Sequence, residues 1–361
     1  MEIGKYRIKP SARIISTIGD SLIGDIHSAV TELVKNSYDA DASYVNIIFN
    51  FSKHESDNLL EIEIEDDGHG MSRDIVLNKW LVPATDDKVT RKLSPKGRLF
   101  QGRKGIGRYA AAILGQELTL TTTDTNFKQT ALRIEWDIFN KSEFLEEIEI
   151  EVSTTKTNQT KSGTVIKILA RDEKYKFWTE SEIEKLTNEL RKLKSPFKEL
   201  FNDKFDINLA FFNCPFSKYN DIVFEIESYP IVDFFDYQIT GKISSEGVLN
   251  AIFTNKTEEN LPNENINTII NLPAGLKYCG PVFFDLRVFD RDPEAIDNLI
   301  NKGLVDPISK RYLSKTSARQ LLNEAYGINL YREGFRIRPY GNGGIDWLDL
   351  DKKRIQDPSF K

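Results

Sequence analysis

The chain has 361 residues, and its 49 lysines and arginines against 55 aspartates and glutamates give a formal net charge of −6. A hydrophobic content of 40%, with 22 phenylalanines and 13 tyrosines, is typical of a globular protein and excludes a disordered chain, a collagen and a disulfide scaffold. The acidic balance argues against binding of nucleic acid along the whole chain, although a local basic patch is compatible with it.

Neither cysteine has a metal-binding or redox spacing. Cys214 and Cys279 lie outside any CxxC or Cys/His cluster, which argues against structural zinc and thiol redox chemistry and fits a reducing compartment. The sequence has no apolar run of signal-peptide length, and none of the roughly 20 residues that a membrane span needs. At about 150 residues per domain, we expect a soluble, cytoplasmic protein of two domains with no membrane partner.

The first predicted elements are a helix and two strands. Apolar residues at helical spacing over 24–40, with Asp25 near the start, predict the helix. An apolar run over 44–51 and the alternating LEIEIE over 60–65 predict the strands. A long loop over 84–108 follows, in which glycine, proline and basic residues replace the periodic pattern.

Strands and helices are mixed in the rest of the chain. Helices are predicted over 107–114, 179–193, 293–302 and 314–326, and strands over 117–123, 131–136, 145–152 and 163–169. This irregular order predicts an α+β fold or a mixed α/β sandwich, and not a regular βαβ series. We expect one domain over 1–197 and a second over 198–361.

Polar residues follow one another along one stripe of the first predicted helix. The spacing of Glu32 and Asn36 puts a carboxylate and a carboxamide on the same helical face, and Asp39 and Ala40 follow about one turn later. A carboxylate that accepts a proton from water, beside a neutral oxygen that ligates Mg²⁺, is what hydrolysis of a phosphoanhydride requires. The alternative is the solvated polar face of an amphipathic helix.

An acidic, glycine-rich turn ends the second predicted strand. It reads Asp66-Asp67-Gly68-His69-Gly70 and is followed by Met71. A carboxylate fixed at a strand end accepts a hydrogen bond from an exocyclic amine such as that of adenine, and glycines let a flat ring approach the backbone. The alternative is an ordinary Asp-Gly turn.

Glycines and cations alternate at the start of the short helix predicted over 107–114. The stretch reads Gly102-Arg103-Lys104-Gly105-Ile106-Gly107-Arg108. Glycines ahead of a helix expose backbone N–H groups at its positive end, and the cations add charge for phosphate oxygens. Eight lysines and arginines against two aspartates over 86–108 place a charge of +6 in this region. The alternative, a dinucleotide fingerprint with Asp124 downstream, lacks the strand that it requires before the glycines.

Taken in order, these motifs resemble those of the GHKL ATPases, the superfamily of gyrase-type topoisomerases, ninety-kilodalton heat-shock chaperones, sensor histidine kinases, MutL and MORC proteins. The matching segments are ELVKNSYDADA (32–42), EDDGHGM (65–71), GRKGIGR (102–108) and Ser162-Gly163-Thr164. The resemblance implies a Bergerat-type ATP-binding sandwich, in which helices cover one face of a mixed sheet and ATP lies under a flexible lid.

The same resemblance implies roles for individual residues. Glu32 looks like the general base, Asn36 like the Mg²⁺ ligand and Asp66 like the residue that binds the adenine amine, while Lys104 looks like a catalytic phosphate-binding lysine. The ATP-binding residues that it implies are Asn36, Asp39, Ala40, Asp66, Gly68, Gly70, Met71, Lys88, Gly102, Arg103, Lys104, Gly105, Ile106, Gly107, Arg108 and Thr164.

The tighter likeness is to the MutL and MORC branch. No histidine lies well upstream of the first predicted helix to accept a phosphoryl group, which argues against a self-phosphorylating kinase. In the MutL and MORC group a second domain, the transducer, supplies a basic residue to the γ-phosphate. Within 327–346, which looks like a strand pair, Arg338 is the first candidate for this catalytic role and Arg336 the second. The alternative is a basic hairpin with solvated arginines.

The sequence therefore predicts Mg²⁺-dependent ATP binding and slow hydrolysis, used as a conformational switch through lid closure and homodimerisation. The alternative is a non-hydrolysing, nucleotide-gated nucleic-acid clamp or a chaperone-like module. Because the chain stops at Lys361 without an evident closing element, we expect it to be the N-terminal part of a longer protein. A missing C-terminal region would then bind a nucleic acid or a protein client.

Overall fold

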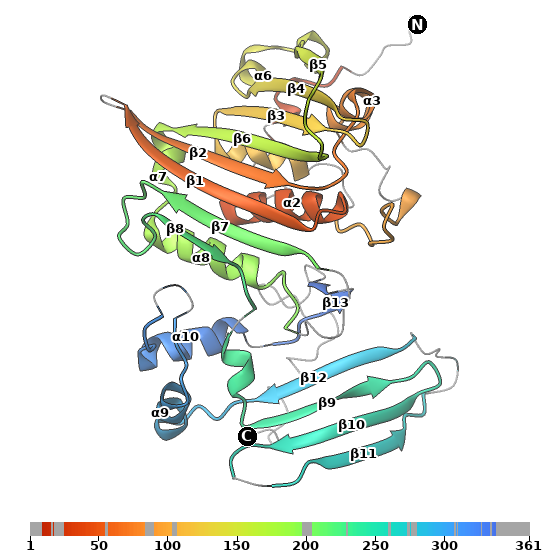
Figure 1. Cartoon of the computed structure of the whole chain (residues 1–361), viewed down its shortest axis with the longest axis vertical. Helices are drawn as coiled ribbons and strands as arrows, with labels where there is room; N and C mark the ends of the chain where they lie inside the picture. Colours follow the sequence, from red (N-terminus) through yellow and green to blue (C-terminus); the bar gives the residue numbers. More distant parts are fainter. Residues whose placement is uncertain are drawn as a thin grey trace, which may run out of the picture. The chain divides into compact units, whose positions relative to one another are not determined.

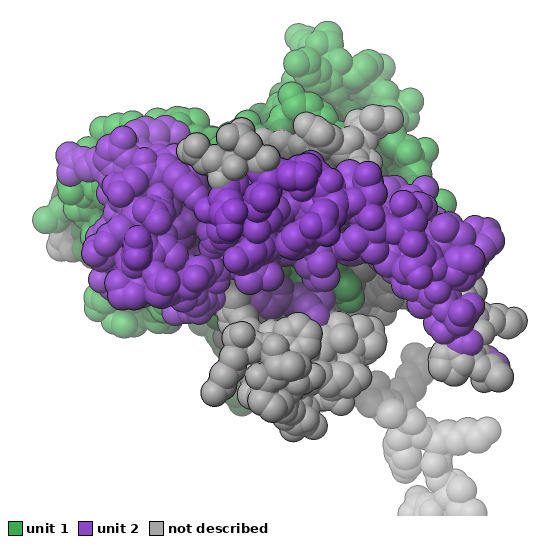
Figure 2. Space-filling model, turned by 90° about the horizontal axis from the view of Figure 1, so that it is seen from below, with its two compact units in different colours: residues 1–227, 329–342 green, residues 228–328, 343–361 purple. Residues whose placement is uncertain are grey.

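The computed structural model describes residues 9–15, 17, 25–54, 57–83, 90–102, 107–196, 204–228, 230–258, 261–272, 275, 280–306, 308, 310–325, 327–332 and 334–336. The chain divides into two compact units. Unit 1 comprises residues 1–227 and 329–342, and unit 2 comprises residues 228–328 and 343–361 (Figure 2).

Unit 1 is built on a large mixed sheet (Figure 1). Among the described residues this sheet has eight strands in the order β5-β4-β3-β6-β2-β1-β7-β8. Neighbouring strands are antiparallel except β1 and β7, which run parallel. The strands are β1 (Tyr44–His54), β2 (Asp57–Asp66), β3 (Glu117–Thr123), β4 (Lys128–Glu135), β5 (Val152–Lys156), β6 (Gly163–Arg171), β7 (Asp206–Phe212) and β8 (Ile222–Glu225).

Helices α2, α5 and α8 cover one face of this sheet (Figure 1). Val45, Ile47 and Phe49 alternate along β1 and are fully buried, as are Val30 and Val34 on α2. The period of two on the strand and the apolar stripe on the helix let these residues form one core. The helical segments of unit 1 are α2 (Ile26–Asp39), α3 (Arg73–Ile75), η1 (Val76–Trp80), η2 (Gly107–Ala110), α5 (Ala111–Leu114), α6 (Ile138–Lys141), η3 (Leu145–Glu147), α7 (Asp172–Lys176) and α8 (Glu180–Arg191).

A small hairpin from the C-terminal part of the chain also belongs to unit 1. It consists of β13 (Tyr331–Arg332) and β14 (Phe335–Arg336). The Phe335 ring lies 4.6 Å from the ring of Tyr38 near the end of α2. The Arg336 N–H donates to the carbonyl oxygen of Leu193, which follows α8.

Unit 2 combines an antiparallel sheet with two helices. In its described part the strand order is β11-β10-β9-β12. A separate core gathers around the helices and consists of Ile231, Ile296, Leu299, Leu304, Ala318 and Leu322. The elements are η5 (Pro230–Phe234), β9 (Tyr237–Ile243), β10 (Val248–Asn255), β11 (Glu264–Ile269), β12 (Val282–Val288), α9 (Pro293–Asn301) and α10 (Lys315–Ala325).

The predicted α+β class, with helices covering a mixed sheet, is confirmed. The strand predicted over 145–152 is wrong, because η3 forms at its start and β5 begins only at Val152. The Leu145 N–H donates to the carbonyl oxygen of Pro10, and the Ala12 N–H donates to that of Glu143. The N-terminal segment therefore pairs with the chain around the start of the predicted strand, at Glu143 and Leu145. Within the described stretches, no helix is long and apolar enough to cross a bilayer.

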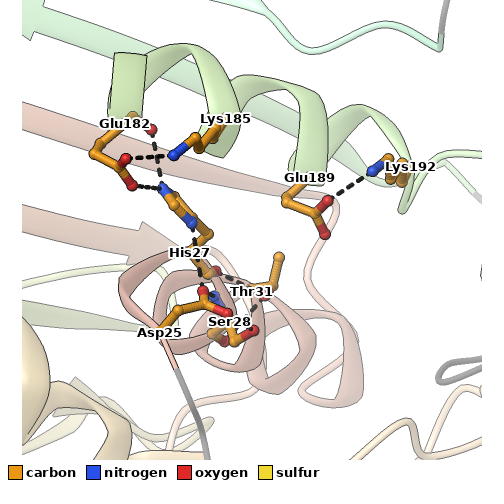
Figure 3. A network of polar contacts seen from close by, with 8 residues as sticks. All are labelled: Asp25, His27, Ser28, Thr31, Glu182, Lys185, Glu189 and Lys192. Carbon is orange, nitrogen blue, oxygen red and sulfur yellow. Dashed lines mark hydrogen bonds and ion pairs between the residues drawn. The ribbon is translucent and has the colours of Figure 1, made fainter. Parts of the chain in front are cut away.

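The start of α2 is fixed to α8 by a network of polar contacts (Figure 3). The Asp25 carboxylate caps α2 by accepting the Ser28 N–H at 2.7 Å. His27 lies with Nε2 2.9 Å from Oε2 of Glu182 and with Nδ1 3.4 Å from Oδ1 of Asp25. The hydrogen bond with His27 lowers the pKa of Asp25 to about 2. These contacts orient the helix that carries Glu32 and Asn36.

Candidate functional site

The middle of α2 brings Glu32 against the glycine-rich segment that precedes α5. Oε1 of Glu32 accepts a hydrogen bond from Nζ of Lys35 at 2.6 Å. A methyl group on Gly107 would lie 3.1 Å from Oε2 of Glu32 and 3.3 Å from its Cβ. Only a glycine leaves the carboxylate undisturbed at this distance. The structure thus joins the first and third sequence motifs at Glu32 and Gly107.

The second motif meets the end of the same helix. The His69 N–H donates to the carbonyl oxygen of Ala40 at 2.9 Å. A methyl group on Gly68 would lie 2.7 Å from that oxygen, so the backbone of Gly68 packs directly on the residue after α2. Ala40 and Gly68, both predicted to line the site, are therefore neighbours.

Asp66, at the end of β2, is held by two donors. Its Oδ1 accepts the Gly68 N–H at 3.0 Å, and its Oδ2 accepts the Ser37 hydroxyl at 2.9 Å. Burial raises the pKa of Asp66 to about 6, although both hydrogen bonds act in the opposite direction. Ser37 was not predicted as a site residue, because a serine inside an amphipathic helix carries no signal of its own.

The adjacent Asp67 has a different environment. Its carboxylate accepts the Ser43 N–H at 2.7 Å and the Tyr44 N–H at 3.1 Å, at the start of β1. Although partial burial opposes the effect, a hydrogen bond from the Ser43 hydroxyl and these two N–H groups lower the pKa of Asp67. Of the two neighbouring carboxylates, Asp66 is the buried one beside α2, and Asp67 serves the chain turn before β1.

Threonines from two strands connect the second motif to Thr164. The Met71 N–H donates to Oγ1 of Thr122 at 2.9 Å, and this hydroxyl lies 3.0 Å from Oγ1 of Thr164. Thr122 is fully buried. Gly70 next to Met71 has φ +62, and a methyl group on it would lie 1.9 Å from the carbonyl oxygen of Thr123. The structure thus brings Gly70, Met71 and Thr164 together, and it adds Thr122, which sequence reasoning missed within its alternating strand.

The C-terminal end of α2 holds the chain that leads into the third motif. The buried Asp39 carboxylate accepts the N–H groups of Gln101 at 2.7 Å and Gly102 at 3.1 Å. The Arg98 guanidinium donates to the carbonyl oxygens of Tyr38 at 3.0 Å and Ala42. Asp39 therefore fixes the entrance of the glycine-rich segment. Arg98 was not predicted, since nothing in the loop distinguishes it from the other basic residues.

Several predicted residues lie outside the described part of the chain: Lys88, Arg103, Lys104, Gly105, Ile106 and Arg338, together with the side chain of Arg108. Arg336, the second γ-phosphate candidate, lies on β14 and is 4% exposed. Their predicted contacts with phosphate remain predictions.

The few oxygen ligands that Glu32 and Asn36 offer fit a metal ion that is coordinated mainly by the phosphate oxygens of a nucleotide. Among the described residues, no three His, Cys, Asp or Glu side chains are clustered as a metal site. Mg²⁺ in nucleotide sites is bound by one or two protein oxygens together with phosphate oxygens and water. The carboxamide of Asn36, one turn after Glu32 on α2, fits that arrangement.

Residues 25–164 match a protein family described as "Histidine kinase-, DNA gyrase B-, and HSP90-like ATPase". The matched segment begins at the cap of α2 and ends at Thr164 on β6, so it spans all four sequence motifs. No curated protein matches the chain.

Gly70→Ala tests the close approach at the second motif. The new methyl group would clash with the Thr123 carbonyl at a positive φ, and we expect a loss of about 3 kcal/mol or more in the free energy of unfolding. Gly97→Ala is the control, because Gly97 also has a positive φ but has no atom within 4 Å of such a methyl group. It should lose only about 1 kcal/mol. Equal losses in urea unfolding would show that backbone conformation, and not the contact with Thr123, makes glycine necessary.

Proposed function

Residues 25–164 belong to the GHKL superfamily of histidine kinase-, DNA gyrase B- and HSP90-like ATPases, and from this we propose that the chain binds Mg²⁺–ATP and hydrolyses it slowly as a conformational switch. The observation that carries the proposal is that two carboxylates, one on α2 and one at the end of β2, each lie against a glycine of a different motif. Glu32 faces Gly107 of the third motif, and Asp66 lies buried beside Gly68 of the second.

Asp66 supports the adenine end of the proposed site. A carboxylate that already accepts from Ser37 and Gly68 still has lone pairs for an exocyclic amine. Gly68 packs closely on Ala40, and a methyl group on Gly68 would lie 3.0 Å from Oδ1 of Asp66. Thr122 and Thr164 hold the backbone of Met71 in place behind it. We assign adenine recognition to Asp66 and its support to Gly68, Gly70, Met71 and Thr164.

Glu32 supports the phosphate end. In the proposed reaction its carboxylate accepts a proton from a water molecule, the water oxygen forms a bond to the γ-phosphorus, and the bond to the bridging oxygen breaks to leave ADP. Asn36 would hold Mg²⁺, which when bound neutralises the phosphate oxygens. We assign phosphate binding to the segment over 102–108, with Lys88 and Arg338 as further cationic contacts.

The switch is supported by the way in which α2 holds neighbouring segments. Asp39 and Arg98 tie the chain over 98–102 to the end of α2. A nucleotide seated on Glu32 and Asn36 would therefore act on a helix that is mechanically linked to the loop over the phosphates. We propose that binding orders this loop and favours a homodimer of the chain, with the C-terminal domain as transducer.

Glu32→Gln tests the assignment of the base. The amide keeps the size of the side chain but accepts no proton, so we expect kcat for ATP hydrolysis to fall at least about 100-fold, with the Kd for Mg²⁺–ATP changed less than about threefold. Glu189→Gln is the matched control, because Glu189 also pairs with a lysine three residues later, on α8. If Glu32→Gln retains the wild-type kcat, the assignment is wrong.

The pKa of Asp66 predicts how ATP affinity depends on pH. Its folded value of about 6 lies above the ordinary value of an aspartate, so the carboxylate that accepts the amine is lost as the pH falls through 6. We expect Kd to rise about tenfold between pH 7.5 and pH 5. In Ser37→Ala, which lacks a hydrogen bond that lowers this pKa, the midpoint should move to higher pH.

Calorimetric titrations of both proteins at a series of pH values measure the effect. Protonation of ATP itself is the same in both series, so the difference between them isolates Asp66. Superimposable curves would contradict the role of Asp66.

A further inference from the structure

Lys35 is an unusual lysine for its position on α2. The residue is only 9% exposed, although lysines rarely lie buried unless they are paired. Its ammonium group lies 2.6 Å from Oε1 of Glu32, which is its polar partner within the described residues. The pair is formed within one turn of the helix, and so it does not depend on a loop to bring the two charges together.

The two oxygens of Glu32 have different neighbours. Oε1 is taken by Lys35, while Oε2 is the oxygen that lies closest to Gly107 in the phosphate-binding segment proposed above. A carboxylate held at one oxygen by a partly buried cation loses rotational freedom about its last torsion. The cation also offsets the repulsion between this carboxylate and an approaching triphosphate.

We propose that Lys35 is the positioning residue for Glu32: it holds Oε1 and directs Oε2 toward the water that attacks the γ-phosphate. This inference rests on the proposed role of Glu32 as the base. Lys35 itself contacts neither water nor nucleotide in this account, and it acts only through the orientation and charge of the carboxylate.

The chain contains a comparable glutamate–lysine pair that is not part of the candidate site. Glu189 on α8 and Lys192, the residue that follows the helix, have the same spacing and lie 2.7 Å apart, with side chains 27% and 22% exposed (Figure 3). The Glu32 and Lys35 side chains are 31% and 11% exposed. Helical pairs of this spacing contribute only a few tenths of a kcal/mol to stability. A large fall in kcat on substitution of Lys35, but not of Lys192, would therefore reflect a change at the Glu32 carboxylate and not a loss of stability.

The test measures kcat for ATP hydrolysis and the Kd for Mg²⁺–ATP in Lys35→Met, Lys35→Arg and Lys192→Met. For Lys35→Met we expect kcat to fall about tenfold or more, while Kd changes less than about threefold. Lys35→Arg keeps the cation and should retain most of kcat, and Lys192→Met should leave both quantities unchanged. If Lys35→Met does not fold, Lys35→Gln, which lacks the charge, takes its place with the same expected loss.

Measuring Glu32→Gln in the same assay distinguishes a failure of the positioning role of Lys35 from a failure of the proposed base, Glu32. If Glu32→Gln loses hydrolysis but Lys35→Met keeps kcat within about twofold, the positioning role is wrong and the proposed base stands. If Lys35→Arg lowers kcat as much as Lys35→Met does, the charge does not orient Glu32, and the inference is also overturned. If Glu32→Gln keeps the wild-type kcat, both the base and its positioning residue are rejected.

Discussion

The packing of α2 on the sheet is the constraint on which the candidate site depends. Its apolar stripe buries Val30, Leu33 and Val34 in the core, and on a different stripe of the helix Glu32 lies against Gly107. The N-terminal end is fixed by Asp25 and His27, and the C-terminal end by Asp39. A helix held at both ends gives its side chains fixed positions, which is what a binding site for a large ligand requires.

Glycines also shape the candidate site, at the few positions where another segment approaches their backbone closely. Gly68 packs on Ala40, Gly70 on Thr123, and Gly107 on Glu32. A methyl group would clash with the backbone at Gly68 and Gly70, and at Gly107 it would press on the Glu32 side chain. Gly68 and Ser37 also donate hydrogen bonds to the Asp66 carboxylate. Burial, and not these hydrogen bonds, raises the pKa of Asp66.

Much of unit 1 could be predicted from local patterns. The apolar spacing of α2 and the alternation in β2 gave elements that the structure confirms. Glycines beside charged residues identified two segments, and both contact residues of the first motif. The motif order also indicated the superfamily whose family description matches residues 25–164.

Partners that are distant in sequence could not be predicted in this way. The parallel pairing of β7 with β1 depends on a connection of more than 150 residues, and no local pattern reports it. Ser37, Thr122 and Arg98 act through contacts that only the folded chain creates. The strand expected over 145–152 is likewise wrong at a place where a distant segment makes contact, since the Leu145 N–H donates to the carbonyl oxygen of Pro10.

Calorimetric titration of the chain and of Asp66→Asn with Mg²⁺–ATP tests the central claim most directly. The claim is that the buried carboxylate between Ser37 and Gly68 recognises adenine. We predict one ATP bound per chain of the wild-type protein and no measurable binding to Asp66→Asn, with both proteins showing the same cooperative thermal unfolding. Equal affinities of the two proteins, or no binding to the folded wild-type chain, would contradict the account.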